Sequence, residues 1–246
     1  IFNPIILLEL LKLVRTLINL IIFFQFTMAA PMIKSFHSIH TQSGMNLEYV
    51  VYMPDGLSGK LPLVLSLHGA GERGRNIDLV DIHGFPKQAK AGTDFPFILV
   101  APQCPLDRYW SDSELVDGLI AIQKSCFQKF NVDTERFYVT GLSMGGYGTY
   151  ALASKIPHKI AAALPVCGVA DLKTIHKMKD IPTWIFHGDQ DQVILVKNSL
   201  DAFGILDQIN PNVHLTIYEG IGHDSWTETY QNPDVLDWML SQQNHR

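Results

Sequence analysis

One serine in this sequence lies in a pattern that supports nucleophilic catalysis. Ser143 is the centre of the pentapeptide GLSMG, a G-x-S-x-G pattern that follows a run of strand-forming residues and precedes a helical stretch. Four glycines in residues 141–148 indicate a tight strand-to-helix turn that exposes the serine hydroxyl, because glycine is costly where the backbone does not require it. An ordinary glycine-rich loop is the alternative. The first interpretation also requires a base near the serine and a group that orients that base.

Two later segments supply candidates for the base and the orienting acid. His223 follows the predicted strand at 213–220, and both Asp189 and Asp191 follow the predicted strand at 181–188. The chain order is therefore serine, aspartate, histidine, with each candidate directly after a strand. Open parallel sheets place catalytic groups at the carboxyl ends of their strands, so we expect the three side chains to meet at one edge of a sheet.

The segments that must position these residues alternate between strand-like and helix-like patterns from Ser35 onward. SFHSIHT and NLEYVVYMP flank the turn at Ser43-Gly44 and are expected to pair as a hairpin. The later strands are short apolar runs, typical of parallel strands buried on both faces: LPLVLSLHG, FPFILVAP, RFYVTGL, IAAALPV, IPTWIFHG and VHLTIYEG. The clearest helix begins at Ser111, where SDSE matches a capping box with Ser111 as the N-cap and Glu114 at the third helical position.

Further helices are expected after the serine, over 195–209 and over 233–242. This alternation predicts an α/β fold, a doubly wound and mostly parallel sheet with helices on both faces. Residues 32–246 contain no Pro/Ser-rich linker and are expected to form a single catalytic domain. The 246 residues, of which 47% are hydrophobic, are sufficient for one core of this size.

The composition argues against several partners. A formal net charge of −5 disfavours binding to nucleic acids or to anionic membrane surfaces. Three cysteines without a CxxC pair predict three buried free thiols, with one disulfide plus a free thiol as the alternative (Cys104, Cys126 and Cys167). The ten histidines are scattered and form no zinc-binding motif, so neither a metal nor a cofactor is expected.

The first 31 residues differ from the rest of the chain. Two basic residues precede an apolar stretch at 17–26, and two alanines follow it (Lys12, Arg15, Ala29 and Ala30), which is the layout of a secretory signal. Non-native upstream sequence, with the native start at Met28 or Met32, is the equal alternative. The expected location is secreted in the first case and cytoplasmic in the second. The apolar stretch is too short for a stable membrane span.

Several longer motifs resemble those of the α/β-hydrolases, within which the chain is most similar to serine esterases of the phospholipase/carboxylesterase, dienelactone-hydrolase-like or "predicted peptidase" group. The resemblance covers about residues 48–240 and depends on LHGAGERG, VAPQCP, YVTGLSMGGYGTYALA, WIFHGDQDQV and GHDSWTETY. It implies that Ser143 is the nucleophile and His223 the general base. The family pattern H-G-x-x-D-x-V implies that Asp191 is the orienting acid, with Asp189 as the minor alternative. Many relatives have Val-Pro shortly after the acid, where this chain has Val193-Ile194-Leu195.

An acyl-transfer serine also needs two N–H groups that stabilise the oxyanion. The N–H of Met144, directly after the nucleophile, is one candidate, and Ala70 or Gly71 in the loop after LHG supplies the other. Gly71, Trp226 and Trp110 are expected to contact substrate, whereas Trp184 lies within a strand and belongs to the core.

Other polar residues near these motifs are expected to be structural. His68 and His187 precede glycines at strand ends and are interpreted as hydrogen-bonding residues of the framework. Glu72 and Arg73 either form an internal ion pair or bind substrate at the mouth of the site, and the ion pair is the preferred interpretation.

The segment 167–180 is as long as one helix with its turns, which leaves no room for a large lid. The expected function is therefore that of a serine carboxylesterase acting on small or soluble esters. The alternatives are a thioesterase, a peptidase or a feruloyl or acetyl polysaccharide esterase with the same three residues, or an inactive binding module.

Overall fold

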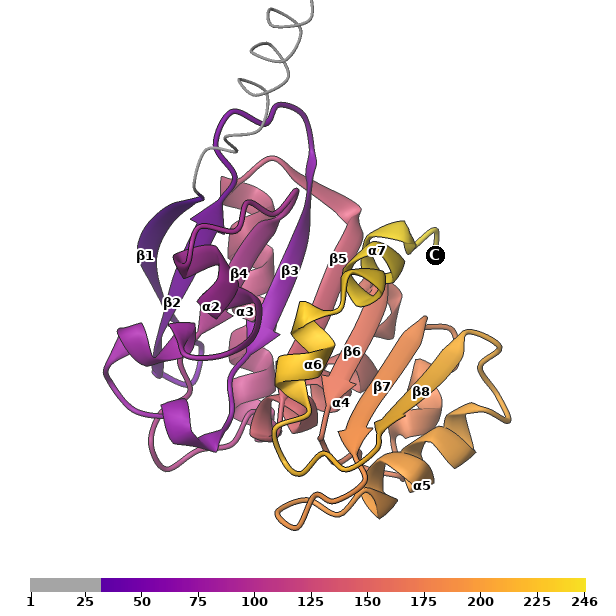
Figure 1. The fold of residues 1–246 in the computed structure, drawn as a ribbon. Helices are drawn as coiled ribbons and strands as arrows, with labels where there is room; N and C mark the ends of the chain where they lie inside the picture. Colours follow the sequence, from indigo (N-terminus) through magenta and orange to yellow (C-terminus); the bar gives the residue numbers. More distant parts are fainter. Residues whose placement is uncertain (1–31) are drawn as a thin grey trace, which may run out of the picture.

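The computed structural model describes residues 32–246, which form one eight-stranded sheet with helices on both faces (Figure 1). The strand order is β1-β2-β4-β3-β5-β6-β7-β8. The β1–β2 and β2–β4 pairs are antiparallel and the other pairs are parallel, so the predicted doubly wound, mostly parallel sheet is confirmed. The strands are β1 (Ile33–His40), β2 (Asn46–Met53), β3 (Leu61–Leu67), β4 (Ile98–Pro102), β5 (Val132–Leu142), β6 (Ala162–Val166), β7 (Thr183–Gly188) and β8 (Val213–Tyr218).

The helices divide between the two faces of the sheet. Helices α2, α6 and α7 lie on one face, and α3, α4 and α5 lie on the other (Figure 1). Their bounds are α2 (Gly84–Lys90), α3 (Ser113–Lys129), α4 (Met144–Lys155), α5 (Lys197–Leu206), α6 (Trp226–Gln231) and α7 (Pro233–Ser241). Four short 3-10 helices connect them: η1 (Ala70–Glu72), η2 (Ile77–Asp81), η3 (Pro157–Lys159) and η4 (Ile175–Met178).

Alternating side chains of the central strands fill two hydrophobic cores. In β3, Leu63 and Leu65 pack into the core beneath α3 and α4, whereas Val64 packs into the core beneath α2 and α7. In β5, Phe137 and Tyr138 divide in the same way. Successive side chains of a strand point to opposite faces, so a strand buried on both faces reads as a continuous apolar run.

The start of α3 differs from the predicted capping box. The helix begins at Ser113 with Asp112 as its N-cap, and no side chain caps it. The Asp112 carboxylate instead accepts the N–H of Tyr109 at 3.1 Å, and Glu114 forms an ion pair with Arg108. The predicted capping box is therefore wrong: the helix begins two residues after Ser111, and Glu114 pairs with Arg108 instead.

Two further expectations concern the loops. The segment between β6 and β7 contains only η4, so it is as short as predicted. Helix α6 was not predicted, and Trp226 is its first residue rather than a loop residue. The expected secretory signal or upstream sequence lies outside the described residues. Within the described part, no helix is long and apolar enough to span a bilayer.

Two glycines in helices provide a matched test of this packing. A Cβ at Gly148 in α4 would overlap the Cβ of Trp110 and lie 2.8 Å from the Cδ1 of Leu67. We expect Gly148→Ala to lower the free energy of unfolding by about 2 kcal/mol, because overpacking a tight core forces side chains apart.

The control is Gly204→Ala in α5, where a Cβ would meet no atom within 4 Å. This substitution is expected to raise the free energy of unfolding by about 0.5–1 kcal/mol, since alanine favours the helix. Urea denaturation of both variants measures the difference. Equal effects of the two substitutions would contradict the packing described for α4.

Candidate active site

Ser143 occupies a strained turn between β5 and α4. Its backbone has φ 53° and ψ −117°, a conformation that non-glycine residues rarely adopt. The Ser143 N–H donates a hydrogen bond to the Val166 carbonyl at 2.9 Å, which ties the turn to the end of β6. The structure therefore contains the sharp strand-to-helix turn that the glycine-rich sequence predicts.

The glycines of the motif are required by close backbone approach. A Cβ at Gly141 would overlap the Gly145 carbonyl, because β5 and α4 fold back on each other at the turn. A Cβ at Gly145 would overlap the carbonyl of Leu67, the last residue of β3. The absence of side chains at these two positions thus allows the serine turn to pack directly against the loop that follows β3.

The three candidate catalytic side chains form a continuous hydrogen-bonded chain. The His223 Nε2 lies 3.0 Å from the Ser143 Oγ, and the His223 Nδ1 lies 2.7 Å from the Asp191 Oδ2. Because a carboxylate only accepts, the proton must be on Nδ1, which leaves Nε2 free to accept the serine proton. The sequence prediction that Ser143, Asp191 and His223 meet at one edge of the sheet agrees with this geometry.

Asp191 is held by backbone groups as well as by the histidine. Its side chain is fully buried, and its Oδ1 accepts the N–H groups of Val193 at 2.8 Å and Ile194 at 2.9 Å. Burial alone raises the pKa of this carboxyl, but the hydrogen bonds from His223 and from these two N–H groups outweigh it and hold the pKa below its ordinary value. Asp191 is therefore ionised at neutral pH and has a defined orientation.

His187 also contacts the Asp191 carboxylate. Its Nε2 lies 2.7 Å from the Ile194 carbonyl and 3.1 Å from the Asp191 Oδ2, and its Nδ1 lies 2.7 Å from the Ser199 hydroxyl. Two acceptors on the Nε2 side require the proton there, so Nδ1 accepts from Ser199. The predicted framework role of His187 agrees with these contacts, which extend directly to the candidate acid.

Asp189, the alternative acid, forms a structural hydrogen bond between two loops. Its Oδ1 accepts the Gly220 N–H at 2.7 Å and so joins the loop after β7 to the loop after β8. Its carboxylate has no hydrogen bond to His223. Of the two aspartates, only Asp191 is brought to the histidine.

Two backbone N–H groups beside Ser143 are free to bind an oxyanion. Within the described residues, the N–H groups of Met144 and Ala70 have no acceptor. Met144 is the first residue of α4, whose N-terminal dipole also favours negative charge at this point. Ala70 begins η1, directly after the Gly69 segment that packs against the serine turn. The candidate pair predicted from the sequence is therefore available in the structure.

Comparison with known proteins agrees with this arrangement. The family model for PET hydrolase-like proteins matches residues 112–241, which is more than half of the chain. The chain belongs to the PET hydrolase-like family. Its α/β-hydrolase fold matches the crystal structure of a thermostable esterase with a TM-score of 0.76 and 31% identity, over 88% of this chain and 64% of the other. The predicted resemblance to α/β-hydrolase serine esterases is thereby confirmed.

Curated relatives of this PET hydrolase-like chain have esterase names. It is 29% identical to the bifunctional acetylxylan esterase/xylanase XynS20E of Neocallimastix patriciarum, over 69% of this chain and 26% of that protein. It is 27% identical to feruloyl esterase B of Neurospora crassa, over 51% of this chain and 45% of that protein. The chain thus spans about a quarter to a half of the length of these relatives.

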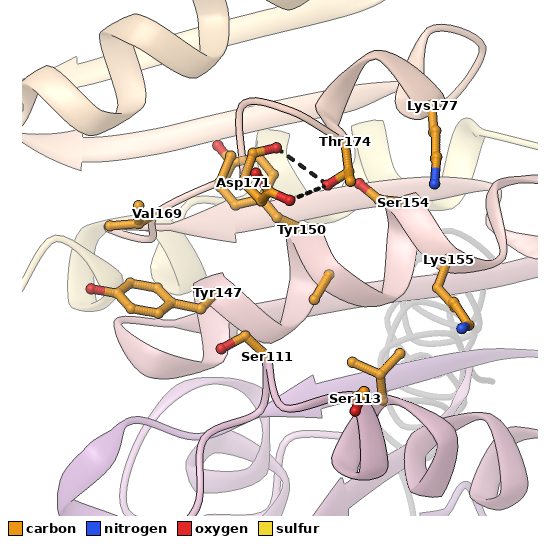
Figure 2. Close-up of a pocket in the computed structure, with 13 residues that line it drawn as sticks. Ser111, Ser113, Tyr147, Tyr150, Ser154, Lys155, Val169, Asp171, Thr174 and Lys177 are labelled. Atoms are coloured by element: carbon orange, nitrogen blue, oxygen red, sulfur yellow. Dashed lines mark hydrogen bonds between the residues drawn. The ribbon is translucent and has the colours of Figure 1, made fainter.

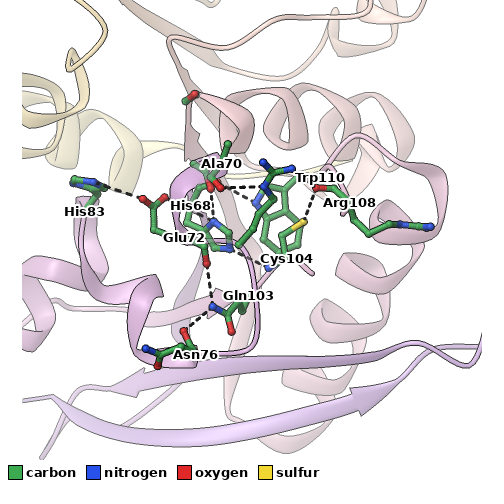
Figure 3. Close-up of polar contacts among 12 residues, drawn as sticks. His68, Ala70, Glu72, Asn76, His83, Gln103, Cys104, Arg108 and Trp110 are labelled. Atoms are coloured by element: carbon green, nitrogen blue, oxygen red, sulfur yellow. Dashed lines mark hydrogen bonds and ion pairs between the residues drawn. The ribbon is translucent and has the colours of Figure 1, made fainter. Parts of the chain in front are cut away.

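Several hydrogen bonds from His68 and Arg73 hold the loop that contains Ala70 (Figure 3). His68 accepts the Cys104 N–H through Nε2 at 2.9 Å, and its Nδ1 donates to the Gly69 carbonyl at 2.6 Å. Arg73 donates from Nε to the Ala70 carbonyl at 3.0 Å. Burial lowers the pKa of His68 to about 4, although its bond to the Gly69 carbonyl acts in the opposite direction. The predicted framework role of His68 is confirmed.

Two expectations about the neighbouring residues are corrected. Trp110 was expected to contact substrate, but its side chain is fully buried and its indole donates to the His68 carbonyl at 3.1 Å. Glu72 and Arg73 were expected to form an ion pair. The nearest basic side chain to Glu72 is instead His83, at 3.8 Å, while the Arg73 guanidinium lies over the Tyr109 ring.

The other two predicted substrate contacts are at least partly exposed. Gly71 is exposed in η1. Trp226 is partly exposed, and its ring meets the His223 ring edge-on with the centroids 5.3 Å apart. Contact of Gly71 and Trp226 with substrate stays a prediction.

Cys167 is a residue of the site that sequence reasoning did not identify. It follows β6 with a φ of 39°, and its sulfur lies within 4.8 Å of ligand atoms of Asp191 and His223. Burial raises the pKa of its thiol to about 12, so the sulfur is protonated. The histidine and the aspartate are already joined by a hydrogen bond, and a protonated thiol is a poor metal ligand. All three cysteines are buried and free, as predicted.

Two cavities are lined by residues close to Ser143 or His223 in the sequence. One, of about 430 Å³, lies along α4 between Tyr147 and Lys155, with Asp171 and Thr174 on the opposite wall (Figure 2). The other, of about 450 Å³, lies between α2 and α6 and is bounded by His83 and Trp226. Neither Ser143 nor His223 is among the residues that line them.

The buried, neutral His68 predicts a pH dependence of stability. Its pKa is about 4 in the folded state and 6.5 in the unfolded state, so between these values only the unfolded state binds the proton. The free energy of unfolding should therefore rise with pH across this window by about 3 kcal/mol from this residue alone.

The measurement is chemical denaturation of the wild type and of His68→Gln between pH 4 and pH 7. The variant, which lacks the titrating group, is expected to show a shallower rise in stability by about that amount. Parallel curves for the two proteins would contradict a neutral, buried His68.

Proposed function

We propose that this protein is a serine carboxylesterase that hydrolyses small or soluble esters through an acyl-enzyme. The proposal depends on one observation, the hydrogen-bonded chain from Ser143 through His223 to Asp191 beside two free N–H groups. The esterase names of the relatives support it. In this proposal Ser143 is the nucleophile, His223 the general base and Asp191 the orienting acid.

The proposed reaction has two halves. In the first, the Ser143 Oγ attacks the ester carbonyl carbon as His223 Nε2 removes the hydroxyl proton, and the N–H groups of Met144 and Ala70 bind the oxyanion. Collapse of the tetrahedral intermediate breaks the bond to the alkoxy oxygen, which leaves as the alcohol with the proton from His223. In the second half, water is deprotonated by His223 and attacks the acyl-enzyme, which releases the carboxylic acid and restores the serine.

The family relatives favour one narrower alternative. An acetylxylan esterase/xylanase and a feruloyl esterase B both align with this chain, so a polysaccharide-linked acyl ester is the second candidate substrate. The short β6–β7 segment, which contains only η4, supports access for such substrates because it forms no large lid. Relative rates on matched esters, thioesters and amides would separate these activities from a thioesterase or a peptidase.

The nucleophile is tested by Ser143→Ala. This variant is expected to lower kcat for p-nitrophenyl acetate by at least about 1,000-fold, since no other group at the site can form the acyl-enzyme. A fluorophosphonate probe should label the wild type and not the variant. Retained turnover or labelling in a folded Ser143→Ala protein would overturn the assignment.

The acid is tested by comparing two neighbouring aspartates. Asp191→Asn is expected to lower kcat by about 10⁴-fold, because the amide favours the wrong tautomer of His223. Asp189→Asn, which removes a carboxylate hydrogen-bonded to the Gly220 N–H, should cost less than about tenfold. The measurement is the rate with p-nitrophenyl acetate for both variants. The reverse order would assign the acid to Asp189.

A further inference from the structure

A second buried imidazole shares the Asp191 carboxylate with His223. The His187 Nε2 lies 3.1 Å from the Asp191 Oδ2, the same oxygen that lies 2.7 Å from the His223 Nδ1. His187 is fully buried near the carboxyl end of β7. Burying a polar ring is costly unless its nitrogens are hydrogen-bonded. The proposed mechanism uses one histidine, so the second requires its own explanation.

His187 completes the set of hydrogen bonds to the acid. The Asp191 Oδ1 accepts the N–H groups of Val193 and Ile194, and its Oδ2 accepts the N–H groups of the two imidazoles. An ionised carboxylate offers about four lone-pair sites, so described residues use all of them. Rotation of the carboxylate therefore breaks hydrogen bonds at both oxygens, and a single orientation is favoured.

His187 also holds the turn that carries the acid. Its Nε2 lies 2.7 Å from the Ile194 carbonyl, and the Ile194 N–H donates to the Asp191 Oδ1 at 2.9 Å. One N–H group of His187 thus binds both the acid and a residue that binds the acid. Because both acceptors face Nε2, the proton stays on that nitrogen. A displacement of His187 would disturb the carboxylate and its turn together.

Ser199 fixes His187 from helix α5, which packs beside β7 (Figure 1). The Ser199 hydroxyl is fully buried and lies 2.7 Å from the His187 Nδ1. Within the described residues, this is the only hydrogen bond of that hydroxyl. A serine inside a helix often bonds to a carbonyl of the preceding turn, whereas Ser199 bonds to the ring nitrogen. The hydroxyl therefore fixes both the position and the tautomer of His187.

We propose that His187 and Ser199 are positioning residues of the esterase site. The hydrogen-bonded chain of the site then continues from Asp191 through His187 to Ser199. Its task is to keep the Asp191 Oδ2 directed at His223 while His223 takes up the serine proton. Misplacement of a catalytic group by about 1 Å can cost about 100-fold in rate. The proposal rests on the proposed esterase function, because that function makes Asp191 the orienting acid.

The first test replaces His187 in two ways. His187→Leu removes both nitrogens and should lower kcat for p-nitrophenyl acetate by about 10- to 100-fold, with KM changed by less than about twofold, because His187 acts through Asp191 and not on the substrate. His187→Gln carries an amide N–H that can replace the Nε2–H. It is expected to keep kcat within about fivefold of the wild type. Urea denaturation measures the stability of both variants in parallel.

A spectroscopic measurement separates positioning from packing. The low-field proton NMR signal of the His223 Nδ1–H reports its hydrogen bond to the Asp191 Oδ2. This signal should move in His187→Leu, because the oxygen no longer accepts two donors, and should stay close to the wild-type position in His187→Gln. A role limited to packing would lower the stability of the protein and leave the signal in place.

Two buried hydroxyls provide a matched control. Ser199→Ala removes the hydroxyl bonded to His187 and should lower kcat about threefold to tenfold. Thr183→Val removes a buried hydroxyl on the same strand as His187, which donates to the Ile181 carbonyl at 2.8 Å. Both substitutions remove one buried hydrogen bond and should destabilise the fold to a similar extent. Only Ser199→Ala is expected to change kcat.

The outcomes separate the two proposals. A wild type that neither hydrolyses p-nitrophenyl acetate nor reacts with a fluorophosphonate probe overturns the proposed function, and the role of His187 with it. If the wild type is active, a folded His187→Leu with kcat within about twofold, or with an unmoved NMR signal, overturns the positioning role alone. Equal losses of kcat in Ser199→Ala and Thr183→Val would do the same. If His187→Leu does not fold, Ser199→Ala decides: an unchanged kcat overturns the proposal, and a loss that Thr183→Val lacks supports it.

Discussion

The contact between the serine turn and the end of β3 determines the rest of the site. Gly145 lies against the Leu67 carbonyl so closely that a side chain there cannot be accommodated. The residues after Leu67 must therefore pass beside the start of α4, and a Cβ placed on Gly69 would lie 3.7 Å from the Ser143 Cβ. The strained φ of Ser143 has the same origin, because the chain reverses within a single residue where β5 ends. One close backbone approach thus positions both Ser143 and the loop that carries Ala70, the residues to which we assign the nucleophile and one oxyanion N–H.

Asp191 is held in place by several hydrogen bonds rather than by close backbone packing. Asp191 accepts hydrogen bonds from two backbone N–H groups and from His223, and His187 limits its movement from behind. A carboxylate with this many partners keeps one orientation without further support. Asp189, two residues earlier, joins two loops and so holds the turn in which the acid lies. Asp189 therefore stabilises the loop structure, whereas Asp191 places a negative charge beside His223.

The sequence predicts the strands, the mostly parallel sheet and the meeting of Ser143, Asp191 and His223 well, because short apolar runs and the GLSMG turn are local signals. Features that depend on distant partners are predicted poorly. The capping box at Ser111 is not formed, because the helix begins at Ser113 and Arg108 pairs with Glu114. Trp110 is buried by α4, whose Gly148 leaves room for it. The position of Cys167 depends on the packing of three loops, and no pattern around it in the sequence indicates this.

The burial of Cys167 makes its chemical modification sensitive to the packing of the site. The thiol is completely buried beside His223 and Asp191, and its pKa is raised to about 12, so it is neither accessible nor ionised in the closed structure. Alkylating reagents and peroxides react with exposed thiolates. Modification at this sulfur therefore requires transient separation of the loops after β6, β7 and β8. Resistance of Cys167 to such reagents is therefore a measure of how well these loops stay packed, independently of any substrate.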